Sequence, residues 1–558
     1  MIEVDSERAA IEARLRERHR GLETLIDLGA SYLSAGDAPA AAALAQVAAR
    51  SAFPDHPGLF GSPRLERLLL SVGQDLPSRT SATQHVRRVV GSGRNVLHVL
   101  TYARPVGGDG RFVWRWMLAD DDSRHSVAVT TQGHYAGVFS VPAYLREAAE
   151  SSGGQLHEIR ASPSNPIDQA LELRRLALGR DLVVLHLWPY DTVPVLALAA
   201  GCGDTPTVMV NHSDHTFWIG GSVAHSVVHL RSQLPQFLAD RRRIDPDRTA
   251  ILPIPLVPSR RAIGRDEAKR ELGLAPETVL LVTVASPFKF SAPGLIGFLD
   301  LVVPVLAKMP QARLVAIGPS LEGAWRAAAD QTGGRIEALG PRWENSVLLA
   351  AADVYLDSVP FSSITSLLEA GCQGLPALGL APMAPDLSLL GPGAPGLDGA
   401  MELASDPDGY RESLTRLIAD PDHRDLRGRR LQSQILSGHT GGGWLEFLRR
   451  LYDDLDACGP RGCVTTDQDS FDVSPLDIAL AQLYEHAHEA HHVPRLIRNY
   501  VGALPYGSRL SVSRRLREAG FTVSPLTSLP PPLSGIVRGV GRPVKRVGQR
   551  FTAAFGRR

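Results

Sequence analysis

A lysine, several hydroxyl side chains and a glutamate in the second half of the chain have the chemistry of a nucleotide site. Lys289 follows TVLLVTVAS, a short apolar run that predicts a buried strand. Ile364, Thr365 and Ser366 stand where a helix is predicted to begin, after the run VYLD. Free N–H groups at a helix N-terminus bind phosphate, and a lysine adds a localised positive charge. Glu369, one turn later, can accept hydrogen bonds from two ribose hydroxyls.

A second group of chemically active residues ends a predicted strand, TPTVMV, in the first half of the chain. His212, Asp214 and His215 follow this strand, and His186 ends the earlier run DLVVLH. In open parallel sheets, ligands bind at the carboxyl ends of the strands. A histidine there can act as a general base or bond to a substrate. The alternative is a histidine that only bonds to a backbone carbonyl group, and the sequence leaves both interpretations open.

A glycine-rich loop, PVGGDG, connects the predicted strand NVLHVLTYA to a helix. Gly107 and Gly108 let the backbone approach a ligand, and the helix beginning near Arg111 directs its free N–H groups toward it. The spacing differs from the G-x-G-x-x-G fingerprint of dinucleotide-binding folds. By itself, the loop indicates only a place where a ligand can lie against the backbone.

Two parallel sheets would position these residues. From residue 95, short buried runs alternate with helical segments, and TAILPIPLVPSRR predicts a linker before the alternation restarts. The predicted fold class is α/β, with two tandem Rossmann-like doubly wound domains, an N-terminal helical hairpin resembling one tetratricopeptide unit, and a C-terminal helical extension. The predicted boundaries are 1–92 for the hairpin region, 93–255 and 256–440 for the α/β domains, 441–525 for the extension, and 526–558 for a proline-rich linker and basic amphipathic tail.

The tandem α/β arrangement resembles the GT-B fold of nucleotide-sugar glycosyltransferases. PFSSITSLLEAGCQGLPALG is similar to the donor-binding loop and helix of glycosyltransferase family 4, where two glutamates separated by seven residues precede a Gly-x-Pro turn. Glu369 matches the second glutamate and Gly374-Leu375-Pro376 the turn, whereas Phe361 replaces the first glutamate. The arginine that usually precedes the family lysine is also absent. SPFKF and Ile364-Thr365-Ser366 resemble the diphosphate-binding residues of protein O-GlcNAc transferases.

This resemblance implies a role for each residue. The nucleotide-sugar-binding residues would be Gly107, Gly108, Lys289, Ile364, Thr365, Ser366 and Glu369, and the catalytic residues His212, Asp214 and His215. The implied reaction moves a sugar from a nucleotide diphosphate sugar, UDP-sugar first among them, to an unidentified protein, glycan or lipid-linked acceptor. No cofactor and no metal are expected, because Lys289 and the helix dipole would carry the charge of the leaving group.

Other functions remain open. Phe361 in place of a family glutamate favours a catalytically degenerate GT-B protein that binds partners, and a nucleotide-sugar epimerase of the same fold would need no acceptor. The hydroxyl residues near Lys289 could also merely cap a helix. His488-Glu489-Ala490-His491-His492 fits the H-E-x-x-H zinc motif, but Pro494 ends the helix and no third ligand follows at a protease-like spacing.

Composition and charge favour a cytoplasmic protein. The 558 residues include 59 Lys+Arg, 59 Asp+Glu and four cysteines, so we expect neither nucleic-acid binding nor a disulfide scaffold. No secretory signal or long apolar run is visible. Residues 534–558 contain seven Lys/Arg and no acid, and one helical stripe carries Val544, Val547, Phe551 and Phe555. This tail predicts peripheral contact with an anionic membrane at the inner face of the cell, or a solubilising end.

Overall fold

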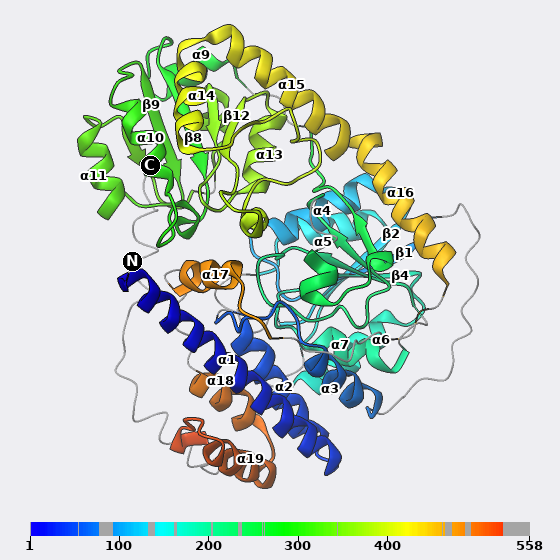
Figure 1. The fold of residues 1–558 in the computed structure, drawn as a ribbon. Helices are drawn as coiled ribbons and strands as arrows, with labels where there is room; N and C mark the ends of the chain where they lie inside the picture. Colours follow the sequence, from blue (N-terminus) through cyan, green and yellow to red (C-terminus); the bar gives the residue numbers. More distant parts are fainter. Residues whose placement is uncertain are drawn as a thin grey trace, which may run out of the picture.

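The computed structural model describes most of the chain as two α/β domains and a layer of helices (Figure 1). The described residues are 2–53, 55–76, 93–105, 107–131, 140–160, 165–201, 205–232, 237–258, 261, 263–342, 344–459, 461, 463, 471–485 and 493–527. The H-E-x-x-H motif and the basic tail lie outside these residues. None of the described helices is long and apolar enough to cross a membrane.

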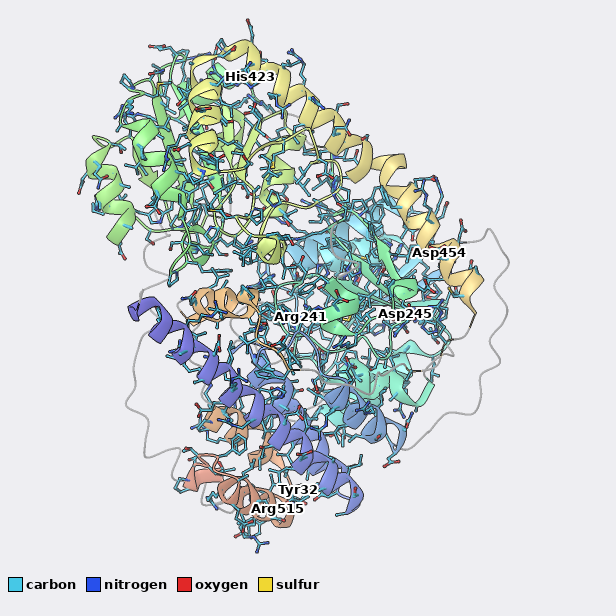
Figure 2. The ribbon with its side chains drawn as sticks, viewed as in Figure 1. Tyr32, Arg241, Asp245, His423, Asp454 and Arg515 are labelled. Carbon is cyan, nitrogen blue, oxygen red and sulfur yellow. The ribbon has the colours of Figure 1, made fainter. Side chains whose placement is uncertain are left out.

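Both ends of the chain contribute to the helical layer. Its members are α1 (Ile2–Ser34), α2 (Ala38–Ala52), α3 (Pro63–Gln74), α17 (Pro475–Glu485), α18 (Val493–Tyr500) and α19 (Tyr506–Glu518). The alanine-rich α2 is largely buried and contacts α1, α3 and α18. Tyr32 Oη lies 2.8 Å from Ser511 Oγ, and Arg515 donates to Ser31 Oγ over 2.7 Å (Figure 2). Helices α1 and α19, from opposite ends of the described chain, therefore pack together.

The N-terminal α/β domain contains a seven-stranded sheet in the order β3-β2-β1-β4-β5-β6-β7. The strands are β1 (Asn95–Leu100), β2 (Arg124–Val129), β3 (Leu156–Glu158), β4 (Leu182–His186), β5 (Thr207–Asn211), β6 (Ser226–His229) and β7 (Thr249–Ile251). All neighbouring pairs are parallel. The helices are α4 (Gly108–Ala119), α5 (Ala143–Ser151), α6 (Pro166–Ala177) and α7 (Val193–Leu198), and α2 and α3 pack on α6 and α7.

The C-terminal α/β domain contains a six-stranded parallel sheet in the order β10-β9-β8-β11-β12-β13. The strands are β8 (Val279–Val284), β9 (Ala312–Ile317), β10 (Ile336–Ala338), β11 (Val354–Leu356), β12 (Ala377–Leu380) and β13 (Glu402–Ala404). The helices are α9 (Arg265–Glu271), α10 (Phe298–Leu306), α11 (Gly323–Gln331), α12 (Ser346–Ala351), α13 (Ile364–Cys372) and α14 (Pro407–Ala419). The predicted fold class, two Rossmann-like sheets with helices at both chain ends, is confirmed.

A long helical arm joins the two domains. After α15 (Pro421–His439), the chain bends at its glycine-rich stretch and continues as α16 (Gly441–Cys458), which runs back along the N-terminal domain (Figure 1). Trp444 Nε1 donates to the Pro253 carbonyl over 2.7 Å, and the Trp444 ring lies 5.8 Å from that of Trp116. Arg94 pairs with Asp456 at 2.8 Å. These contacts hold α16 against the first domain.

Two details were not predicted from the sequence. The predicted linker 249–261 begins with β7, which adds a seventh strand to the first sheet before the proline-rich part starts. Cys463 is disulfide-bonded, whereas Cys372 and Cys458 are free. The low cysteine count excluded a disulfide scaffold but not a single bond.

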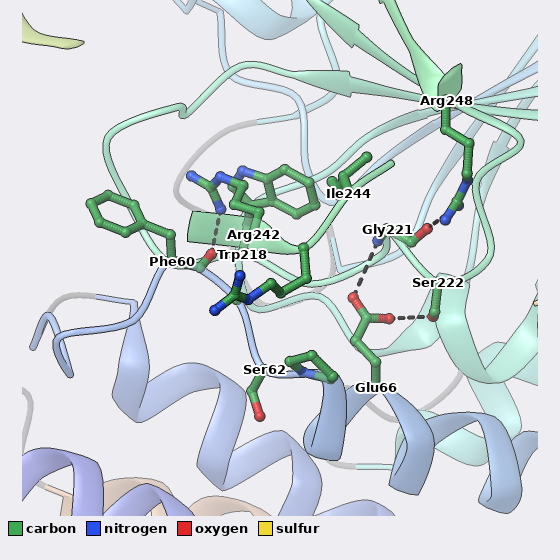
Figure 3. Close-up of a pocket in the computed structure, with 12 residues that line it drawn as sticks. Phe60, Ser62, Glu66, Trp218, Gly221, Ser222, Arg242, Ile244 and Arg248 are labelled. Atoms are coloured by element: carbon green, nitrogen blue, oxygen red, sulfur yellow. Dashed lines mark hydrogen bonds between the residues drawn. The ribbon is translucent and has the colours of Figure 1, made fainter. Parts of the chain in front are cut away.

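Helix α3 docks on the N-terminal domain through a buried carboxylate (Figure 3). Glu66 accepts from the backbone N–H groups of Gly220 at 2.6 Å and Gly221 at 3.2 Å, and from the Ser222 hydroxyl. Burial raises the pKa of Glu66, although these bonds oppose that effect. The cavity beside it measures about 40 Å³, enough for water and too small for a substrate.

Candidate functional site

Lys289 lies at the N-terminus of α13, where the sequence predicted a phosphate site. The residue belongs to a short 3-10 turn, Pro287–Phe290, at the carboxyl end of β8. Its Nζ donates to the Ser362 carbonyl over 2.9 Å, directly before the first turn of α13. Thr365 and Ser366 are half-buried in that turn, while Ile364 is buried in the core and offers only its backbone N–H. The lysine and the helix N-terminus thus face the same place.

A buried aspartate shapes the loop before α13. Asp357, at the carboxyl end of β11, accepts from the backbone N–H groups of Ser358 and Ser363 over 2.9 Å each. Burial raises the pKa of Asp357, while the bonds from the backbone N–H groups of Ser363 and Ser358 and the charge of Lys289 lower it. The carboxylate therefore ties both ends of the loop to the strand and fixes where α13 begins.

Residues of the N-terminal domain lie close to Lys289 across the boundary between the two domains. Asp214 forms an ion pair with Arg231, with Nε 2.8 Å from Oδ2, and lies 3.3 Å from His215 Nδ1. Arg231 also donates to the carbonyls of Leu389 and Gly391 in the other domain, over 2.7 and 2.5 Å. We name Asp214, His215, Arg231 and Lys289 the Lys289 cluster. It depends on both domains.

The charged groups of the Lys289 cluster shift one another's pKa values. Burial and the charge of Arg231 lower the pKa of Lys289 to about 8, against the opposing effect of Asp357 and Asp214. Burial would raise the pKa of Asp214, but Arg231 and His215 outweigh it and bring the pKa to about 2. Burial lowers the pKa of His215, with Asp214 opposing. An added anion would relieve the crowding of positive charge around Lys289.

Phe361, at the position that the family 4 resemblance assigns to a glutamate, packs into the middle of this cluster. Its ring is 1% exposed and lies edge-on to the His215 ring at 4.6 Å. The Lys289 ammonium stands 4.4 Å from the centre of the same ring. The position that would carry a carboxylate in family 4 enzymes here supplies an aromatic wall and a cation–π contact.

A cavity of about 320 Å³ opens between the domains beside α13. Its lining includes Ser366 and Glu369 of α13, Arg111 and Arg115 of α4, and Val284 at the end of β8. Glu369 Oε1 lies 2.6 Å from Arg115 Nη2 and 3.4 Å from Arg111 Nη1. Among the described residues, no partner of Glu369 Oε2 occurs. One carboxylate oxygen is therefore held by the other domain and one remains open to the cavity.

His212 lies apart from the Lys289 cluster, beside the glycine-rich loop. Gly107 caps the N-terminus of α4, Gly108 begins the helix, and Asp109 follows in its first turn. His212 Nδ1 stands 3.9 Å from Asp109 Oδ1, and His212 Nε2 stands 3.0 Å from His186 Nδ1. The His212 side chain is 8% exposed. The structure thus groups His212 with the loop and His186, and groups Asp214 and His215 with Lys289.

Several residues of the candidate site were not predicted from the sequence. Arg231 comes just after the buried run SVVH, so the sequence could have placed it at the carboxyl end of a strand. Arg111 and Arg115 are four residues apart, so they lie on one side of α4, and Asp109 stands in its first turn, just after the glycine-rich loop. Within the described part of the chain, no group of three or more His, Cys, Asp or Glu side chains could hold a metal ion.

Comparison with known proteins gives a likeness in fold. No protein-family model and no curated protein matches the chain. HepE of Anabaena, solved with UDP and glucose, has a TM-score of 0.48 and 13% identity, covering 65% of this chain and 99% of that one. A variant of the Thermobaculum terrenum O-GlcNAc transferase has a TM-score of 0.45 and 17% identity, covering 80% and 83%.

A third structure has a similar relation to the chain. The sucrose-phosphate synthase of Thermosynechococcus elongatus has a TM-score of 0.46 and 14% identity, covering 66% of this chain and 100% of that one. The chain thus has a low similarity to HepE, to an O-GlcNAc transferase variant and to a sucrose-phosphate synthase. At these identities the comparisons establish neither a donor nor an acceptor for this chain.

Proposed function

We propose that this protein is a glycosyltransferase that takes a sugar from a nucleotide diphosphate sugar. The observation that carries the proposal is the position of Lys289, whose ammonium lies at the N-terminus of α13. The carboxyl edges of both sheets contribute residues around it. A diphosphate supplies the negative charge that this lysine, Arg231 and the helix N-terminus together favour.

The neighbouring cavity would hold the nucleoside part of the nucleotide. A volume of about 320 Å³ lies at the small end of the range of ligand pockets, as expected for a nucleoside. Glu369 Oε2 faces no described partner and would accept from the ribose hydroxyls. As the bond between sugar and diphosphate breaks, negative charge grows on the leaving phosphate, which Lys289 and the N–H groups of α13 stabilise. UDP-sugar is the first donor to test, with a protein, glycan or lipid-linked acceptor.

A catalytically degenerate binding protein is the second candidate. Phe361 removes a family carboxylate, and its ring covers one side of Lys289. Arg115, only 10% exposed, holds Glu369 across the domain boundary. A protein that uses its domains only to bind partner proteins would keep these contacts and bind no nucleotide sugar.

Calorimetry with UDP, GDP and ADP tests the proposal directly. We expect one of them to bind the native protein, and Lys289→Met to weaken that binding. Lys308→Met is the matched control, because Lys308 is an exposed lysine of the same domain. Native protein that binds no nucleotide diphosphate would favour the degenerate alternative.

Incubation with the sugar nucleotide and no acceptor then separates the enzymes. Slow release of free nucleoside diphosphate supports a transferase, and appearance of an epimeric sugar nucleotide supports an epimerase.

A further inference from the structure

Four histidines, three of them buried, form a continuous row across the N-terminal sheet. They come from neighbouring strands or their ends: His125 (β2), His98 (β1), His186 (β4) and His212, which follows β5. His125 Nδ1 lies 3.1 Å from His98 Nε2, His98 Nδ1 lies 3.1 Å from His186 Nε2, and His186 Nδ1 lies 3.0 Å from His212 Nε2. We name these four residues the histidine row.

The sheet register explains why these side chains meet. His125 pairs with Val96, and His98 stands two residues farther along β1. His98 in turn pairs with Val184, and His186 stands two residues farther along β4. An offset of two keeps side chains on one face of a sheet. The row therefore runs diagonally across a single face toward the carboxyl edge, where His212 emerges.

The surroundings of the row keep its imidazoles neutral. His98, His125 and His186 are each 1% exposed or less. Burial lowers the pKa of all four histidines, and Asp109 opposes that effect at His212. A neutral imidazole carries one N–H and one bare nitrogen, so each ring donates once and accepts once.

One backbone carbonyl then decides every tautomer in the row. His125 Nε2 lies 2.9 Å from the Asp120 carbonyl oxygen, which can only accept, so the proton of His125 sits on Nε2. Its bare Nδ1 must accept from His98 Nε2–H. The same reasoning places the proton of His186 on Nε2, and then that of His212. The bare nitrogen left at the end of the row is His212 Nδ1.

We propose that His125, His98 and His186 are positioning residues that fix the tautomer of His212 and present its Nδ1 as the proton acceptor of the reaction. Among the described residues, His212 Nδ1 has no hydrogen-bond partner, and Asp109 Oδ1 stands 3.9 Å away, beyond hydrogen-bond reach. A proton placed on any other bare nitrogen of the row would set two N–H groups against each other.

The inference rests on the proposed function, because it assigns a step within sugar transfer. The acceptor's O–H bond breaks as its oxygen forms a bond to the sugar carbon, and the proton passes to His212 Nδ1. The bond from that carbon to the phosphate breaks, and its electron pair leaves with the nucleoside diphosphate. Asp109 then faces an imidazolium and stabilises its charge. His212 Nε2–H keeps its bond to His186 throughout.

Nitrogen NMR of protein labelled with ¹⁵N-histidine tests the tautomer without any substrate. The His212 signals are identified by their loss in His212→Gln. We expect a protonated Nε2 and a bare Nδ1 in the native protein. His186→Leu removes the acceptor of Nε2–H and should give a mixture of tautomers, whereas His186→Asn offers a carbonyl oxygen and should restore the native signals. A native His212 protonated on Nδ1 would overturn the inference.

Two further variants keep the test informative. His125→Leu breaks the row at its far end and leaves His212 and His186 in place, so a mixture is expected there too, even if His186→Leu fails to fold. His423→Leu is the control, because His423 pairs with Glu402 at 2.6 Å in the other domain and should leave His212 unchanged. If the His212 tautomer stayed unaltered in every folded variant of the histidine row, the inference would be overturned.

Kinetics connects the tautomer to the reaction. His186→Leu should lower kcat about tenfold or more with the donor Kd unchanged, and His186→Asn should recover most of the rate. If a variant with mixed His212 tautomers transferred sugar at the native rate, the inference would be overturned but the proposed function would stand. Absence of any transfer by the native protein, with the expected tautomer present, would instead overturn the proposed function.

Discussion

The histidine row and the Lys289 cluster bury polar side chains by opposite means. The row comes from one domain, carries no net charge and is ordered by strand register. The cluster joins charged residues of both domains, with Asp214 and Arg231 on one side and Lys289 on the other. Arg231 reaches the carbonyls of Leu389 and Gly391 in the second domain.

The contrast shows which part of the site depends on the domain arrangement. Neutral imidazoles need only a hydrogen-bond partner when buried, and a neighbouring strand supplies one. Buried charges need opposite charges and several donors, which one sheet edge does not provide here. The proposed proton acceptor is therefore prepared within the first domain, whereas the proposed phosphate site needs residues of both domains.

The largest expected effect comes from the end of the row. His212→Ala should lower turnover by about 10² to 10⁴-fold, the usual contribution of a general base, while donor affinity stays near that of the native protein. Steady-state kinetics and calorimetry measure the two quantities separately. His423→Ala serves as the control, and a His212→Ala enzyme with near-native turnover would return His212 to a structural role.

Loss of a charge from the Lys289 cluster should lower the free energy of unfolding. Arg231→Met removes the main partner of the buried Asp214 carboxylate and should lower the free energy of unfolding by about 3 kcal/mol. Adding Asp214→Asn should recover much of that loss, because the unpaired charge is then gone. Urea denaturation measures both.

An exposed pair gives the matching control for this stability test. Arg450→Met breaks a surface pair with Glu446 and should cost less than about 1 kcal/mol. If Arg231→Met cost no more than this control, Asp214 and Arg231 would not behave as a buried pair.

Lys289 links the cluster to pH. Lys289→Met should weaken nucleotide diphosphate binding by about 2 kcal/mol, the size of a charge-assisted bond. A lysine binds phosphate when protonated, so with a pKa of about 8 the native affinity should be steady below that pH and fall above it. Lys289→Arg keeps its charge throughout this pH range, so its affinity should not fall above pH 8. A native affinity that rises with pH above 8 would contradict this.

Glu369 should show the smallest effect. Glu369→Gln keeps the shape of the side chain but weakens its acceptor, so ribonucleotide affinity should fall by about 1 kcal/mol while pyrophosphate affinity is unchanged. Calorimetry with both ligands makes the comparison. Equal losses for the two ligands would indicate that the residue acts through its pairs with Arg115 and Arg111.

The sequence was enough to predict the elements. Buried apolar runs alternating with helical segments predicted two parallel sheets, because such runs cannot face water and need helices on both faces. The same runs placed Lys289 and His212 at the carboxyl ends of strands. The proline-rich stretch hid the short β7, since three strand residues carry too little pattern to be distinguished from a linker.

Only the tertiary structure decided which distant residues meet. Four histidines spread from residue 98 to residue 212 become one row through a register that periodicity does not specify. Arg115 reaches Glu369, and Arg231 reaches Leu389, through the packing of one domain on the other. Local spacing determines strands and helices because it acts through neighbouring residues. The site depends on strand register and domain packing, which join residues far apart in the chain and are set by the whole fold.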